Sequence, residues 1–196
     1  MKILKRIVTP LLALFLIFGC ASKIPHQLVS GYEKKGARLI AVMPVKHQCA
    51  DATAPQMFRQ KVISELYFKG YPRITPGVID EKLSSLYGGT TELSRGDIPP
   101  ASVGELLNVD AVLYVTLTEC TTSYRLVYAS VVVSAALEMR SAKTGETLWN
   151  VRHRAVKRTF GITGKQLEMG SREIFEPALQ EVVDKTLDTL PYGPDL

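Results

Sequence analysis

The residues that could perform the widest range of chemistry in this 196-residue chain are its three cysteines, Cys20, Cys49 and Cys120. A thiol can carry a lipid, close a disulfide, ligate a metal or attack a substrate. His47 and Cys49 could supply two metal ligands, but no second pair accompanies them, and zinc sites use three or four protein ligands. No G-x-S-x-G, P-loop or G-x-G-x-x-G motif is present. We therefore expect no metal, no cofactor and no catalytic residue, and we predict that the chain is not an enzyme.

Cys20 follows a segment that is typical of an export signal. Residues 1–6 carry three positive charges, and residues 7–22 carry none. Thr9 and Pro10 interrupt the apolar stretch near its start, and Gly19 ends it. A membrane-spanning helix needs about 20 mostly apolar residues, so this stretch is too short to span. A positive start, a short apolar core and small residues at the end predict a signal peptide.

The end of this segment, Ile17 to Cys20, resembles a bacterial lipobox. In such signals the cysteine thiol receives a diacylglyceryl group, and cleavage makes the cysteine an acylated N-terminus. Phe18 departs from the pattern, in which a small residue is usual. We expect residues 1–19 to be a lipoprotein signal peptide and Cys20 to be lipidated. The alternatives are a plain signal peptide or a short uncleaved anchor.

The residues after Cys20 bear on localisation. In envelope lipoproteins, which this segment resembles, an aspartate directly after the lipidated cysteine favours retention in the inner membrane. Position 21 is alanine, so we expect the outer membrane, with the domain facing the periplasm. Residues 20–36 show no strong periodicity, and we expect them to be a lipid-anchored tether. Removing residues 1–19 leaves 21 Lys and Arg against 19 Asp and Glu, a net charge of +2. So small a net charge gives no support for nucleic-acid binding.

Residues 37–196 are predicted to form a single α/β domain. Apolar runs at 37–45 and 110–118 predict buried strands, and 71–75 predicts a short extended segment. Helical spacing predicts helices over 55–70, 78–87 and 99–108. This alternation indicates a parallel α/β core. Residues 123–138 and 146–160 then predict long antiparallel strands joined by a turn at Lys143–Gly145, and 177–190 predicts an amphipathic C-terminal helix with Pro177 in its first turn.

Two side-chain groups follow from this arrangement. Cys49 and Cys120 each follow a predicted parallel strand, and those strands would be neighbours in a flavodoxin-like order. In an oxidising compartment the two could form a disulfide; the alternative is two separate buried residues. Arg152, Arg154 and Arg158 share one strand face. That face could contact anionic lipid, glycan or an acidic partner, although a charged edge strand that avoids aggregation is the favoured interpretation.

The segments DAVLYVTLTECTTSYR and AALEMRSAKTGETLWN, residues 110–125 and 135–150, carry a family resemblance. They resemble a family of bacterial lipoproteins of unknown function whose best-known members are genome-derived surface-antigen candidates of Neisseria. The resemblance implies a fold similar to the TolB N-terminal, anticodon-binding-like domain and to the periplasmic domain of the curli-secretion lipoprotein CsgG. It implies no catalytic motif, and it transfers only the lipidated cysteine, to Cys20.

The expected function follows from the lipobox, the compact domain and the family resemblance. We expect an envelope accessory or assembly factor that acts through protein contacts in a transport or secretion complex, beside a CsgG-like partner, with self-association left open. The alternative is a lipoprotein that binds a small envelope molecule or glycan at the carboxyl ends of the strands. His47, Asp51 and Glu119 would lie near that end.

Overall fold

The computed structural model describes residues 23–35, 37–87 and 98–194, so the expected signal peptide and Cys20 lie outside the described residues. Within these ranges, no helix has both the length and the apolar composition that crossing a bilayer requires. The strands are β1 (His26–Leu28), β2 (Ile40–Val42), β3 (Lys46–His47), β4 (Ala111–Tyr124), β5 (Tyr128–Ser141) and β6 (Thr147–Phe160). The helices are α2 (Tyr32–Lys35), α3 (Ala54–Phe68), α4 (Pro76–Tyr87), α6 (Pro100–Leu107) and α7 (Gly164–Leu187).

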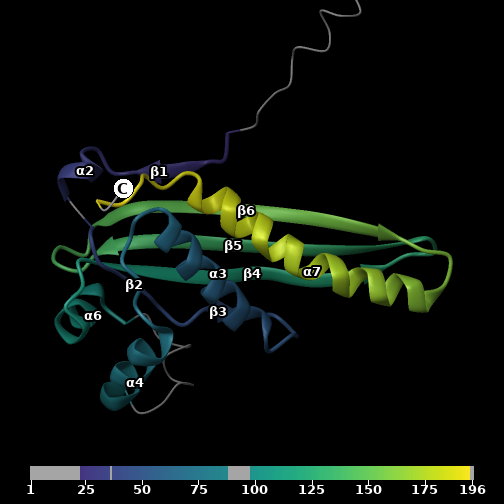
Figure 1. The fold of residues 1–196 in the computed structure, drawn as a ribbon, viewed down its shortest axis with the longest axis horizontal. Helices are drawn as coiled ribbons and strands as arrows, with labels where there is room; N and C mark the ends of the chain where they lie inside the picture. Colours follow the sequence, from purple (N-terminus) through teal and green to yellow (C-terminus); the bar gives the residue numbers. More distant parts are fainter. Residues whose placement is uncertain (1–22, 36, 88–97, 195–196) are drawn as a thin grey trace, which may run out of the picture.

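The strands form one mixed sheet in the order β1-β6-β5-β4-β2, and β3 continues beside β4 (Figure 1). β2 and β3 pair with β4 in parallel, whereas β4, β5 and β6, each 14 residues long, pair antiparallel. The predicted class is therefore confirmed: a parallel α/β part extended by antiparallel strands, with a C-terminal helix. The expected extended segment at 71–75 belongs to no strand.

Helices cover the two faces of the sheet unequally. α3 and α7 pack on one face, where Phe58, Trp149 and Leu179 are fully buried in the main core. α4 and α6 cover only one end of the other face, through a second cluster that contains Ile79 and Val103. The rest of that second face we call the open face. Its side chains come from alternate positions of β4, β5 and β6: Tyr114, Thr116, Glu119, Thr121, Ser130, Val132, Ser134, Ala136, Glu138, Arg140, Asn150, Arg152, Arg154, Val156 and Arg158.

The predicted strand over 123–138 is wrong, because the chain reverses direction within it. β4 continues to Tyr124, and the backbone N–H of Arg125 donates to the carbonyl of Tyr128 (2.8 Å), which closes a two-residue hairpin loop at Leu126 and Val127. Such loops usually contain Asn, Asp or Gly. An apolar loop lacks that signal, so the sequence pattern hid the turn.

The C-terminal helix begins earlier than predicted. α7 starts at Gly164 with a capping box, in which the Thr163 hydroxyl accepts from the Gln166 backbone and the Gln166 side chain accepts from the Thr163 backbone. Pro177 therefore lies inside the helix and not in its first turn. The N-terminal half of α7, from Gly164 to Glu176, is mostly polar, so its sequence shows no apolar helical spacing. Only part of one side of this half contacts the sheet, through Leu167 and Ser171.

The expected tether is also wrong for part of its length. Residues 26–28 form β1, which pairs antiparallel with β6 so that His26 lies opposite Val151. Tyr32 is buried in the main core. An edge strand pairs through its backbone and needs no apolar periodicity, so this pairing leaves no mark in the residue pattern. Only the residues before His26 are left to act as a tether.

Candidate functional site

The candidate site is a cavity of about 440 Å³ on the open face, beside the end of β2. The sheet supplies its floor through Tyr114, Thr116 and Glu138, and Ile98 and Pro99 supply a wall. Lys46 and Arg140 contribute cationic side chains to the lining. Successive side chains of a β-strand point to opposite faces of the sheet. The lining residues of β4 and β5 therefore point away from α7, and their sequence neighbours Val115, Leu137 and Met139 point into the core.

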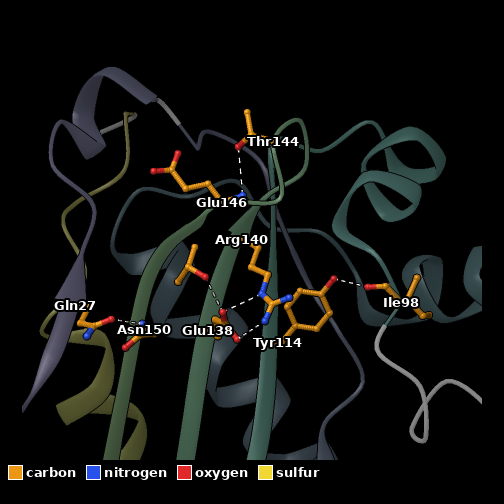
Figure 2. A network of polar contacts seen from close by, with 9 residues as sticks. Gln27, Ile98, Tyr114, Glu138, Arg140, Thr144, Glu146 and Asn150 are labelled. Atoms are coloured by element: carbon orange, nitrogen blue, oxygen red, sulfur yellow. Dashed lines mark hydrogen bonds and ion pairs between the residues drawn. The ribbon is translucent and has the colours of Figure 1, made fainter.

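A polar network at this cavity joins side chains of β4, β5 and β6 (Figure 2). Arg140 donates from Nε and Nη2 to the two carboxylate oxygens of Glu138, both at 2.9 Å, and the Thr147 hydroxyl donates to Glu138 Oε1 at 2.7 Å. The Arg140 guanidinium lies 5.6 Å from the centre of the Tyr114 ring, and the Tyr114 hydroxyl donates to the Ile98 carbonyl. The network therefore ties the sheet to the segment that begins α6.

At the edge of the sheet, the side-chain amide of Asn150 donates to Gln27 Oε1 at 3.0 Å, which joins β6 to β1 (Figure 2). At the hairpin turn, the Glu146 backbone N–H donates to the Thr144 hydroxyl at 3.3 Å. Gly145 has φ +72° there, which a residue without a side chain adopts freely. The turn predicted at Lys143–Gly145 is confirmed.

The chemistry of this arrangement favours binding over catalysis. A general base must reach the proton that it removes, yet both oxygens of Glu138 are engaged by Arg140 and Thr147. The cavity instead presents a charged and hydroxyl-bearing lining on a rigid sheet, which suits a polar ligand or a polar protein segment. Across the part of the chain that the structure describes, no three His, Cys, Asp or Glu side chains are grouped to hold a metal ion.

The residues expected near the strand ends have separate roles. His47 lines a smaller cavity with Arg59 and Asp80. Asp51 accepts from the Thr53 hydroxyl (2.7 Å) and backbone N–H (2.8 Å), and these hydrogen bonds lower the pKa of its carboxyl.

Glu119 lies on the open face and accepts from Arg154 Nε at 3.0 Å, which lowers the pKa of the Glu119 carboxyl. The structure therefore does not gather His47, Asp51 and Glu119 into one ligand site.

Cys49 and Cys120 are joined by a disulfide in the structure, with Cα atoms 5.1 Å apart. β3 carries the chain alongside β4 and delivers Cys49 next to Cys120. A bulge between Leu117 and Glu119 turns Cys120 toward the core side, where both cysteines pack against the main cluster.

Arg152, Arg154 and Arg158 all lie exposed on the open face, opposite Ala136, Ser134 and Ser130 of β5. The side chains of His153, Ala155 and Lys157 point to the opposite face, toward α7. Among these, Lys157 forms an ion pair with Glu181, and burial lowers the pKa of the His153 imidazole.

Arg59 is a buried arginine that was not predicted from the sequence. Arg59 donates from Nε and Nη2 to the Val42 carbonyl (3.1 and 2.7 Å) and from Nη1 to both carboxylate oxygens of Asp80 (2.9 and 2.8 Å). Asp80 therefore anchors α4 to α3. The available signal was an arginine next to Phe58 on the apolar side of a helix, where an unpaired charge would be costly.

Three comparisons place this fold among known proteins. The model of the family described as "Putative lipoprotein GNA1162-like" matches residues 29–190. The "Putative lipoprotein NMB1124/NMB1162" of Neisseria meningitidis serogroup B is 24% identical over 148 residues, which are 75% of this chain and 68% of that protein. The family match confirms the resemblance seen in the sequence.

Solved structures agree on the fold. The crystal structure of lipoprotein GNA1162 from Neisseria meningitidis has a TM-score of 0.54 at 24% identity, and the match covers 69% of this chain and 94% of that one. A PelC dodecamer from Paraburkholderia phytofirmans has a TM-score of 0.50 at 12% identity, over 86% of this chain and 98% of that one. At such identities the likeness concerns the fold alone.

Proposed function

Because the chain belongs to the GNA1162-like family of lipoproteins, we propose that it is an envelope lipoprotein whose acylated Cys20 holds it at the outer membrane, facing the periplasm. It acts there as an accessory or assembly factor, through protein contacts in a transport or secretion complex. A CsgG-like lipoprotein is the proposed partner. Self-association is part of the proposal, because the similar fold of PelC forms a dodecamer.

The observation that carries the proposal is the open face. Three 14-residue strands present a rigid surface on which Arg152, Arg154 and Arg158 are exposed. Rigid, charged surfaces of this kind favour specific recognition of an oppositely charged partner. The polar network around Glu138 and Arg140 holds the end of this surface next to α6 in one conformation.

The anchoring is tested by replacing Cys20 with serine. We expect wild-type cells fed labelled palmitate to yield a labelled protein in the membrane fraction, because two or more acyl chains give stable anchoring. Cys20→Ser should carry no label, and Cys49→Ser, the matched control, should keep it. A labelled, membrane-bound Cys20→Ser protein would contradict the assignment of Cys20.

The protein contact is tested by placing a photo-crosslinking residue at position 152 on the open face, and a matched one at position 173 on the exposed side of α7. Irradiation of intact envelopes should give a reproducible protein adduct from position 152 and none of the same mass from position 173. Identical adducts from both positions, or none from either, would refute a partner on the open face.

A ligand-binding lipoprotein is the second candidate, and the cavity at Tyr114 and Glu138 favours it. Thr116→Trp would fill that cavity. If a small envelope molecule is bound, native mass spectrometry of the protein from envelopes should show an added mass that the Thr116→Trp variant lacks. An unliganded mass for both proteins would reject this alternative.

A further inference from the structure

The far end of the sheet carries an unusual hairpin loop. Leu126 and Val127 are the central residues of the β4–β5 turn, and they are 95% and 55% exposed. Exposed loops of this length are normally polar, because the turn itself gains nothing from an apolar side chain. Two apolar residues at the apex therefore indicate a surface that is covered when the protein works.

The connection from β6 to α7 adds to the same surface. Phe160 and Ile162 are 74% and 87% exposed. The Gly161 N–H donates to the Val127 carbonyl (3.1 Å), and the Phe160 ring lies 6.2 Å from that of Tyr128, so the two loops are adjacent. We call Leu126, Val127, Phe160 and Ile162 the apolar tip. It lies at the end of the sheet remote from α4, α6 and the C-terminus (Figure 1).

The charges around the apolar tip are cationic. Arg125 precedes the hairpin loop, Arg158 lies just before Phe160, and Lys165 follows Ile162, all exposed. Glu168, in the first turns of α7, is paired with Arg172 at 2.7 Å. Exposed aromatic and aliphatic side chains among Lys and Arg are the composition that binds the interface of an anionic bilayer.

The position of the tip relative to the expected anchor supports the same occupant. His26 pairs with Val151 of β6, and the six residues from Cys20 to His26 can span about 20 Å at most. The acyl chains of Cys20 would thus keep this edge of the sheet near the bilayer. β6 then runs past the exposed Arg152, Arg154 and Arg158 and reaches Phe160 about 30 Å further on.

We propose that the apolar tip inserts into the headgroup region of an anionic phospholipid bilayer, the same leaflet that holds the acylated Cys20. This inference rests on the lipid anchoring in the proposed function. The acyl chains and the tip form two contacts at different points along β6, so the domain lies on the membrane in one orientation and does not swing on its tether. The open face is thereby presented at a constant angle.

Tryptophan fluorescence tests the insertion, because the single native tryptophan, Trp149, is fully buried. The acylated protein is reconstituted into phosphatidylglycerol-containing vesicles with plain or brominated acyl chains. In Ile162→Trp, bromine should quench the added fluorescence roughly twofold, since inserted side chains reach about 5–10 Å into the interface. Phe68→Trp, an exposed aromatic position at the end of α3, is the matched control and should be unaffected.

The outcomes separate this inference from the anchoring. If mass spectrometry shows no lipid on Cys20, the proposed function fails first. If Cys20 is acylated but the tryptophan at 162 is quenched no more than the one at 68, the insertion is refuted. The emission of the tryptophan at 162 could instead shift to shorter wavelength only at high protein density and without quenching by bromine. That result would assign the tip to a protein contact, and it also refutes insertion.

Discussion

At the scale of single residues, a buried tyrosine pair joins distant parts of the chain. The hydroxyls of Tyr32 and Tyr71 are 3.0 Å apart, and Tyr71 donates to the Pro191 carbonyl at 2.9 Å. Burial raises the pKa of Tyr32 far above its ordinary value, and the hydrogen bond to Tyr71 adds to that rise. Burial also raises the pKa of Tyr71, against the lowering effect of that hydrogen bond.

This pair predicts a loss of stability in alkali. Above pH about 10 the unfolded tyrosines lose protons while the buried ones keep them, so the unfolding free energy falls as pH rises. Below that pH both states are protonated and the pair contributes no pH dependence. In urea titrations above pH 10, Tyr32→Phe should lessen the fall by about 1.4 kcal/mol per pH unit. The exposed Tyr67→Phe is the control, and an equal slope for Tyr32→Phe and wild type would contradict the prediction.

The buried Arg59 gives a second prediction at this scale. Arg59→Met leaves the Val42 carbonyl and the Asp80 carboxylate without their partner, which should lower the unfolding free energy by about 3 kcal/mol. Lys61→Met on the same helix breaks the more exposed pair with Glu176 (2.8 Å) and should cost less than about 1 kcal/mol. Urea unfolding measures both. Equal costs would show that Arg59 contributes no more than a surface charge.

At the scale of elements, the sheet depends on which strands become neighbours. β2 and β3 pair with β4 in parallel, and the crossover that connects them to β4 contains α3, α4 and α6. The disulfide closes this crossover, because Cys49 and Cys120 lie 71 residues apart in the sequence. It therefore restrains the part of the chain with the longest-range pairing.

Removal of the disulfide should destabilise the domain substantially. Closing a loop of this length is worth about 4 kcal/mol in the chain-entropy model. We expect the urea midpoint of the wild type to fall on reduction, and that of the double variant Cys49→Ser/Cys120→Ser to be low with or without reductant. Intact mass under non-reducing conditions reports the bond directly. Free thiols at both positions in the native protein would exclude the pairing.

At the scale of the whole molecule, the C-terminal segment closes the fold. Thr189 accepts from the Trp149 indole N–H at 3.0 Å, Leu190 is buried, and the Gly193 N–H donates to the Lys69 carbonyl at 2.6 Å. With the Tyr71–Pro191 bond, these contacts join the segment after α7 to β6 and to the end of α3. The segment after α7 therefore meets the core at the end of the sheet opposite the apolar tip (Figure 1).

A truncation tests this closure. A chain that ends at Asp188 loses Leu190 from the core, worth about 1.5–3 kcal/mol, and two side-chain hydrogen bonds, about 1 kcal/mol each. We expect the unfolding free energy to fall by about 4 kcal/mol and the Trp149 emission to shift toward longer wavelength. A chain that ends at Pro194 keeps these contacts and is the control. Equal stability of the two chains would show that the segment only lies on the surface.

The sequence by itself determined the features that depend on neighbouring residues. Apolar runs and helical spacing are local, and so they predicted the α/β class, the Lys143–Gly145 turn and the alternation that puts Arg152 and Arg154 on one face. The polar cavity was not predictable, because Lys46, Tyr114 and Glu138 belong to different strands and meet only through the register of the sheet.

The tertiary structure decided whatever depends on pairing across the chain. It drew residues 26–28 into the sheet as β1, because an edge strand bonds through backbone groups that every residue carries. It buried Arg59 by supplying Asp80 from another helix. It also placed a turn at Leu126 and Val127, where the apolar residues predict a continuous strand. Periodicity reports which side of an element is buried, and only the folded chain shows which partner buries it.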